Sequence, residues 1–177
     1  MMQRVLNFGS PAWLKALMQQ QPDLESAVTR FRAVATDNKL GVLSGPEADY
    51  VKISFLAELD QSQSLQALLV EARWLIENDS AVCVYLAMPT KTPAAQQRAR
   101  TKDLLLQLLL QEQVFARQGL ARIGLRLPMR PNNALSLMLQ SAGFQVPPRG
   151  FVHGPIAADA TEVWWADLAK QTGLTWR

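Results

Sequence analysis

The sequence predicts an α/β (α+β) protein, with a mixed, mostly antiparallel sheet of about six strands, helices on both faces and one parallel strand–helix–strand crossover. Two observations carry this prediction. Residues 81–88 are apolar without alternation, which is typical of a central strand covered on both faces. Residues 121–127 alternate between apolar and polar side chains, and a leucine-rich helix at about 103–117 separates the two strands. We expect a right-handed crossover, which makes these two strands parallel.

The N-terminal part of the chain is expected to hold two helices. Ser10 is a favourable N-cap and Pro11 suits the first helical position, so the first helix begins here and ends near Pro22. The second helix is expected at about 23–35. Five apolar residues recur at helical spacing on one face of it: Leu24, Ala27, Val28, Phe31 and Val34.

The middle of the chain is expected to alternate between strands and one helix. Residues 37–39 suggest a turn, and residues 40–43 a short strand. Residues 50–59 alternate as a half-buried strand does, with Lys52, Ser54 and Glu58 on the side opposite the apolar residues. Residues 64–77 carry leucine and alanine at helical spacing and predict a helix.

The C-terminal part is expected to contain a short helix and two strands. Asn132 or Asn133 can cap the helix, and Gly143 ends it. Strands are expected at 151–153 and 162–168, the second containing two adjacent tryptophans.

The composition predicts one globular domain over residues 1–177, with N-terminal helices at 1–38. The crossover leaves a helix N-terminus beside strand ends, where anionic ligands bind, so residues 81–144 are a candidate cofactor-binding core. The start of the chain shows neither a membrane-spanning apolar run nor a cleavage site, so we expect a cytoplasmic protein. Cys83 and His153, the single cysteine and histidine, form no zinc-binding cluster, and no metal site is predicted. Cys83 is expected to be a small core residue.

The positive charge is concentrated in the half that contains the crossover. No acid lies between Glu112 and Asp159. Five arginines fall in this stretch: Arg117, Arg122, Arg126, Arg130 and Arg149. This distribution either serves solubility or favours an anionic partner, which could be a phosphorylated cofactor, nucleic acid or an acidic protein.

In the order of its elements, the chain resembles the GNAT superfamily of acyltransferases over most of residues 40–170. The clearest local match is the short helix that opens at Asn132 and ends in Gly143-Phe144, and the ending at 163–168 is also similar. The helix expected at 64–77 has no obvious counterpart in that family.

The resemblance implies a binding site for acetyl-CoA, or another acyl-CoA, between Leu86–Met88 and Leu125–Leu127. The pantetheine arm would pair with the edge of the first of these strands. The pyrophosphate would lie on a loop at the start of the long helix, here residues 96–101, where Ala99 and Thr101 stand in place of glycines. The predicted cofactor-binding residues are Gln96, Arg98, Arg100, Thr101 and Lys102, with Asn132 near the pantetheine or the start of its helix.

The resemblance also shows a departure in the chemistry. Members of the family often carry a tyrosine four residues before the helix-ending glycine, where it protonates the departing thiolate. That position is Leu139, and leucine cannot donate a proton. No catalytic residue is assigned.

Three functions remain open from the sequence. The first is an N-acyltransferase that moves an acetyl or other acyl group from acyl-CoA to a primary amine. The second is a catalytically degenerate GNAT-like binding or assembly module with protein partners, similar to small GNAT-like proteins among the virion-assembly genes of short-tailed phages. The third is a basic domain that associates with nucleic acid.

Overall fold

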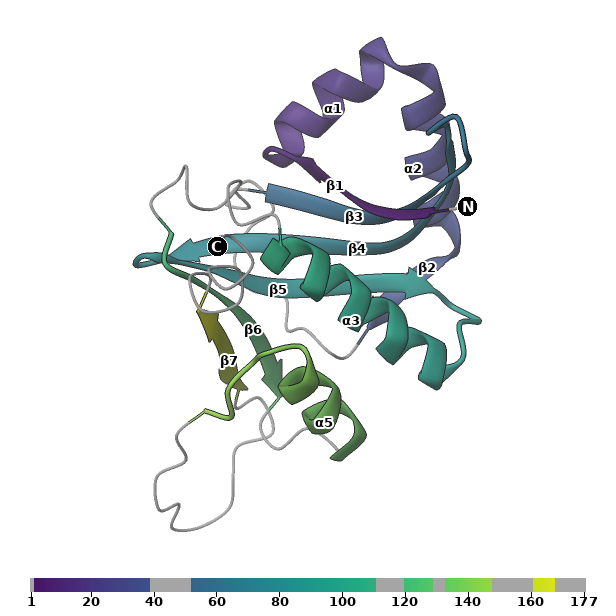
Figure 1. Cartoon of the computed structure of the whole chain (residues 1–177). Coiled ribbons are helices and arrows are strands. Elements are labelled where there is room, and N and C mark those ends of the chain that lie inside the picture. The colour runs from purple at the N-terminus through teal and green to yellow at the C-terminus, as the bar shows by residue number, and fades with distance from the viewer. Residues whose placement is uncertain (1, 39–51, 111–119, 129–132, 148–160, 168–177) are drawn as a thin grey trace.

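The structure is a computed structural model that describes residues 2–38, 52–110, 120–128, 133–147 and 161–167 (Figure 1). Within these residues one sheet has seven strands: β1 (Met2–Phe8), β2 (Ala35–Asn38), β3 (Lys52–Leu59), β4 (Leu65–Glu77), β5 (Ser80–Pro89), β6 (Arg122–Pro128) and β7 (Thr161–Asp167). The helices are α1 (Pro11–Gln20), α2 (Pro22–Val34), α3 (Ala94–Leu110) and α5 (Asn133–Ser141). The strand order is β1-β3-β4-β5-β6-β7, and β2 pairs with β5 outside this path.

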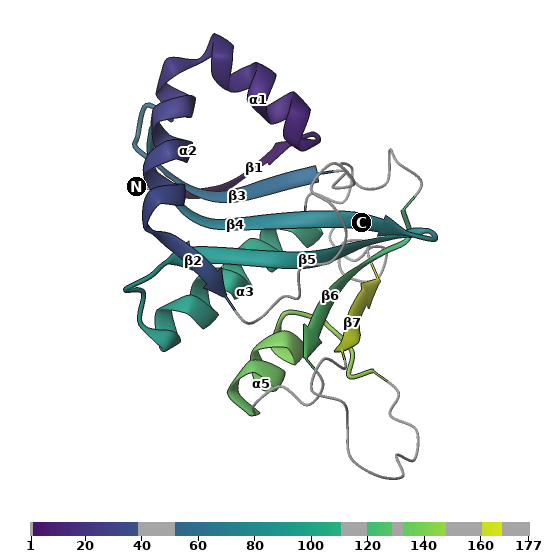
Figure 2. The same cartoon turned by 180° about the vertical axis from the view of Figure 1, so that it is seen from behind.

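Helices pack against both faces of the sheet, as the sequence predicts. The helices α3 and α5 lie in front of the sheet in Figure 1, where their leucines join the largest apolar cluster together with Leu86, Leu125 and Trp164. The helices α1 and α2 pack on the opposite face, over Phe55 and its apolar neighbours, and Figure 2 shows this side. In the described part of the chain, no helix is long and apolar enough to cross a membrane.

The two N-terminal helices form where the sequence places them. The Oγ atom of Ser10 accepts a hydrogen bond from the Trp13 N–H, and Pro11 fills the first position of α1. In α2, four of the five predicted apolar residues are buried, whereas Val34 is 55 % exposed because the helix ends there and the chain turns into β2.

The predicted helix at 64–77 is wrong, because these residues form strand β4. Its pairing with β3 contains two irregularities, which skip Gln66 and Leu69 on β4. Each β-bulge shifts the in–out alternation of a strand by one residue. Two shifts within a few residues turn a period of two into a spacing that imitates a helix, so Leu65 and Leu68, three residues apart, pack on the same face of the sheet.

Two further strands were not predicted. Strand β1 pairs antiparallel with β3 along its whole length, although its sequence has little alternation. Strand β2 occupies Ala35–Asn38, so the turn expected at 37–39 is wrong at its first two residues. The strands expected at 40–43 and 151–153 lie outside the described residues.

The crossover is confirmed. Strands β5 and β6 are parallel, and α3 connects them in sequence. This helix begins at Ala94, earlier than the predicted residue 103, and its predicted end beyond residue 110 lies outside the described residues. Strand β7 pairs antiparallel with β6, and Gly124 leaves room for Trp165, because a Cβ on this glycine would lie 2.8 Å from its ring.

The short helix α5 ends as predicted at Gly143, which has a φ of 100°. The Phe144 N–H donates to the carbonyl of Leu139, and the Gly143 N–H donates to the carbonyl of Gln140. These two bonds form a Schellman cap, for which glycine is favoured because the left-handed conformation excludes most side chains.

Candidate functional site

The parallel strands β5 and β6 part after a short paired segment. Pairing joins Ser80–Cys83 to Arg122–Leu125, and beyond these residues the two strands have no register with each other. The separation coincides with a bulge, since Arg73 lies opposite Tyr85 and Trp74 opposite Cys83, which leaves Val84 as the extra residue of β5. A bulge increases the local twist, so the second half of β5 turns away from β6 (Figure 1).

The edge of β5 that this separation exposes is covered by the chain itself. Strand β2 pairs antiparallel with Leu86–Pro89, while β4 pairs with the other edge of the same segment (Figures 1 and 2). The N–H and the hydroxyl of Thr90 both donate to the carbonyl of Val34, at 2.7 Å each, and fix the start of β2. The expectation that Leu86–Met88 offers an open edge for pantetheine is therefore wrong.

The predicted phosphate loop at 96–101 is also wrong, because these residues are part of α3. The Gln97 N–H donates to the Pro93 carbonyl at 2.9 Å, so helical hydrogen bonding has begun at Gln97. Only the amides of the first helical turn lack a partner within the helix. Thr101 is fully buried, and its hydroxyl donates a hydrogen bond to the Gln97 carbonyl at 2.8 Å. The Thr101 side chain therefore packs within the protein and bonds to its own helix.

The other predicted residues of α3 divide between two flanks of the helix. Side chains four positions apart lie on the same flank, so Arg98 lies beside Lys102, and Gln96 lies beside Arg100. The two pairs are about 160° apart around the axis, given about 100° per residue. Asn132 lies outside the described residues. Phosphate binding by any of these side chains stays a prediction.

The position at which the resemblance implies a tyrosine lies in the core. Leu139 is fully buried in α5 and belongs to the apolar cluster under α3. Its side chain therefore contributes to packing, and leucine holds no proton to transfer.

A charged network on the α2 face of the sheet was missed at the sequence level. The carboxylate of Glu71, which is 1 % exposed, accepts from Nε and Nη2 of Arg32 at 3.0 and 2.9 Å and from Nε of Arg73 at 2.8 Å. The guanidinium of Arg73 also stacks on the ring of Tyr85, at 4.2 Å from its centroid. Glu71 and Arg73 are two residues apart and share one face of a strand, a signal that the helical interpretation of 64–77 concealed.

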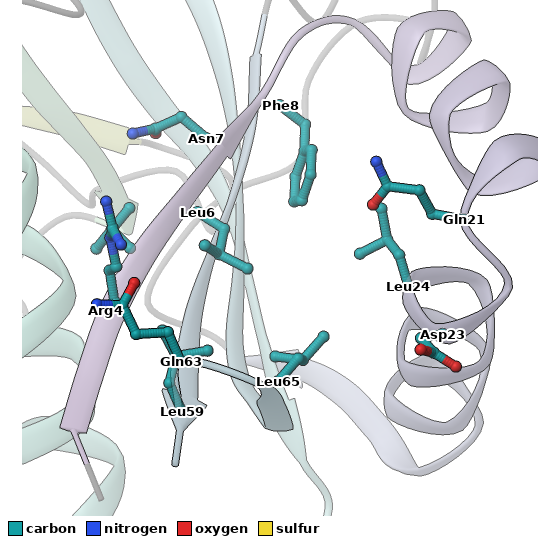
Figure 3. Close-up of a pocket in the computed structure, with 11 residues that line it drawn as sticks. Arg4, Leu6, Asn7, Phe8, Gln21, Asp23, Leu24, Leu59, Gln63 and Leu65 are labelled. Carbon is teal, nitrogen blue, oxygen red and sulfur yellow. The ribbon is translucent and has the colours of Figure 1, made fainter. Parts of the chain in front are cut away.

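Two cavities flank α1 and α2. The first, of about 730 Å³, lies between β1 and α2, where Leu6, Phe8, Leu24 and Leu65 point into it (Figure 3). The second, of about 580 Å³, is lined by residues of α1, by Arg32 of α2 and by Ile53 of β3.

Besides Glu71, two buried titratable groups lie in the described part of the sheet, Lys52 and Cys83. Burial lowers the pKa of Lys52 to about 8 and raises the pKa of Cys83 to about 12. A thiol with so high a pKa is protonated at neutral pH and is a poor nucleophile, which agrees with the expected core role of Cys83.

No family model matches the sequence, and no curated protein matches it either. Solved structures do resemble it. An N-acetyltransferase from Staphylococcus aureus is 9 % identical, with 95 % of this chain and 99 % of that chain covered and a TM-score of 0.54. The ribosomal-protein-S18-alanine N-acetyltransferase from Escherichia coli is 15 % identical, with 94 % of each chain covered and a TM-score of 0.48. An acetyltransferase from Bacillus subtilis, solved in complex with CoA, is 12 % identical, with 94 % and 99 % covered and a TM-score of 0.46.

At these identities a likeness shows the fold alone, and the S. aureus protein is the one of the three whose TM-score exceeds 0.5. The order of elements also agrees with the order that the resemblance implies: antiparallel strands, a central strand, a long helix, a parallel strand and a short helix ended by glycine. The chain therefore has the fold of the GNAT acyltransferase superfamily.

Proposed function

We propose that this chain is a GNAT-fold binding or assembly module that does not hold acyl-CoA in the groove beside β5. The observation that carries the proposal is the pairing of β2 with Leu86–Pro89. The family resemblance implies that pantetheine would pair with the same strand edge. A backbone N–H or C=O that is already bonded within a ladder is not available to a ligand.

Displacing β2 would weaken the binding of a cofactor. A backbone hydrogen bond contributes about 0.5–1.5 kcal/mol net, so the loss of about three bonds costs about 2–4 kcal/mol. This cost lowers the apparent affinity of the ligand by a factor of about 30–1,000.

Two other features support the proposal. Helix α3 already spans Gln96–Thr101, where the resemblance implies a loop with exposed amides. Leu139 is buried where the resemblance implies a proton donor. Of the three places at which the resemblance implies contact with the cofactor, backbone pairing thus occupies the strand edge, apolar packing occupies the tyrosine position, and helical hydrogen bonding has begun by Gln97 at the third.

Thermal unfolding in the presence of acetyl-CoA tests the proposal. A ligand at 100 times its Kd stabilises a protein by about 2.7 kcal/mol, which for a chain of this size raises the Tm by about 5–10 °C. We expect no rise in Tm at 1 mM acetyl-CoA beyond that caused by 1 mM ATP, which serves as the polyanion control. A rise of several degrees that is specific to acetyl-CoA would overturn the proposal.

A second candidate function is the transfer of an acyl group from acyl-CoA to a primary amine after β2 has left its place. The separation of β5 and β6 at the Val84 bulge favours this candidate. In the transfer, the amine nitrogen forms a bond to the thioester carbonyl carbon, the carbon–sulfur bond breaks, and the amine proton ends on the thiolate. With Leu139 in the core, water would have to deliver that proton.

A substitution in β2 distinguishes the two functions. Hydrogen-bonded pairs repeat at every second residue of an antiparallel ladder. The Thr90 N–H donates to the Val34 carbonyl, so Thr36 and Met88 are expected to form the next hydrogen-bonded pair. Thr36→Pro removes one N–H from this ladder, whereas the matched control Thr36→Ala keeps it. If the chain is an enzyme, the proline variant alone gains a thermal shift with acetyl-CoA and releases free thiol in the presence of amines. If it is a module, neither variant does so.

A further inference from the structure

The cavity between α1 and α2 combines an apolar wall with two cations. Leu14 and Met18 of α1 and Ile53 of β3 form the apolar part, and Lys15 and Arg32 supply positive charge. No carboxylate is among the described residues that line this cavity. Its volume of about 580 Å³ falls in the range of small-molecule sites.

Arg32 is held in a fixed orientation at this cavity. Its Nε and Nη2 atoms donate to the two carboxylate oxygens of Glu71, at 3.0 and 2.9 Å. A bidentate pair of this kind fixes the plane of the guanidinium. The Arg32 side chain is nevertheless 36 % exposed, and two of its five N–H donors are used in the pair. The other three can serve a ligand.

Two arginines share one carboxylate, since Glu71 accepts hydrogen bonds from both Arg32 and Arg73. Lys15 adds a positive charge from α1, so two cations meet at this cavity with no carboxylate among its described lining residues. Such an arrangement attracts an anion to the mouth of the cavity.

We propose that this cavity binds a small amphiphilic carboxylate. The carboxylate would lie between Arg32 and Lys15, and a short aliphatic or aromatic body would lie against Leu14, Met18 and Ile53. Arginine suits this role because its planar donors match the two oxygens of a carboxylate. The site is separate from the groove beside β5, so this proposal does not depend on the function proposed above.

Calorimetric titration with sodium octanoate, at pH 7 and below its micellar concentration, tests the proposal. We expect octanoate to bind with a Kd below 1 mM, and octylamine and 1-octanol to bind at least about tenfold more weakly because they lack the negative charge. Acetate, which lacks the apolar body, is expected to bind at least about tenfold more weakly as well. No octanoate binding at 5 mM, or equal binding of octylamine or octanol, would overturn the proposal.

Two variants locate the site. Lys15→Gln changes an exposed residue and is expected to weaken octanoate binding about threefold, whereas the matched control Lys91→Gln, outside the cavity, leaves binding unchanged. The pair Arg32→Met with Glu71→Gln removes the oriented guanidinium without leaving a buried carboxylate unpaired, and is expected to weaken binding at least about tenfold. Circular dichroism serves as the check that this variant is folded. Equal effects of the two lysine variants would place octanoate elsewhere and refute the assignment.

Discussion

The substitution Glu71→Gln tests how much the buried network contributes to stability. The glutamine keeps the shape of the side chain and removes its charge. If the amide oxygen takes the place of Oε2, it still accepts from Nη2 of Arg32 and Nε of Arg73, which now lie 2.9 and 2.8 Å from Oε2. The amide NH₂ group then faces Nε of Arg32, which lies 3.0 Å from Oε1, so two donors oppose each other.

The expected loss follows from these contacts. One charge-assisted hydrogen bond is lost, worth about 1.5–3 kcal/mol, and the two arginines lose their counter-charge. Removing one partner of a buried ion pair typically costs about 3–5 kcal/mol, and we expect a decrease of that size in the free energy of unfolding. For a chain of this length, the Tm falls by about 6–20 °C.

Urea denaturation followed by circular dichroism measures the effect, with the m-value as the check that the unfolding reaction has not changed. The matched control is Glu58→Gln on the half-buried Glu58 of β3, which is expected to alter stability by less than about 0.5 kcal/mol. If Glu71→Gln costs less than about 1 kcal/mol at an unchanged m-value, the network does not stabilise the fold. Glu71 would then not hold Arg32 in the orientation described above.

Three other substitutions have effects on stability that can be predicted from the surroundings of a single residue. Gly124→Ala is expected to cost about 1–3 kcal/mol in thermal unfolding, since its Cβ would lie 2.7 Å from Val163 and 2.8 Å from Trp165; a change below about 0.5 kcal/mol would contradict this packing. Burial lowers the pKa of Lys52 to about 8 in the folded chain, from its usual 10.5. Between these pH values the unfolded chain binds more protons than the folded chain, so the free energy of unfolding rises with pH across this window. Lys52→Met should abolish that rise in urea titrations at pH 7.5 and pH 10, and an equal rise in both proteins would refute the assignment. Ser10→Ala removes the cap of α1 and is expected to cost about 1 kcal/mol in urea denaturation, whereas Ser10→Gly should cost only a few tenths; equal losses would show that the cap bond does not act as described.

Local signals in the sequence were reliable where one interaction decides the structure. Ser10 and Pro11 start α1, and Gly143 ends α5, because a cap depends on the hydrogen bonds and backbone angles of a few adjacent residues. The crossover between β5 and β6 was also predictable, because a strand buried on both faces must be apolar throughout.

The sequence was misleading where pairing with a neighbouring strand changes the alternation of apolar and polar residues. The bulges of β4 depend on its register with β3, and they erase the alternation by which a strand is recognised. The pairing of Glu71 with Arg32 could not be predicted either, because these residues are 39 positions apart and meet only when α2 packs on the sheet.

By itself, the sequence determined the fold class, the parallel crossover and the ends of the short helices, since these depend on apolar periodicity and on local backbone preferences. Only the tertiary structure decided what lies along the second half of β5. Strand β2 reaches that edge from more than forty residues away, and no periodicity within either segment encodes a pairing over that distance. A GNAT fold without this pairing would offer an open strand edge to a cofactor, whereas in this chain β2 already pairs with that edge.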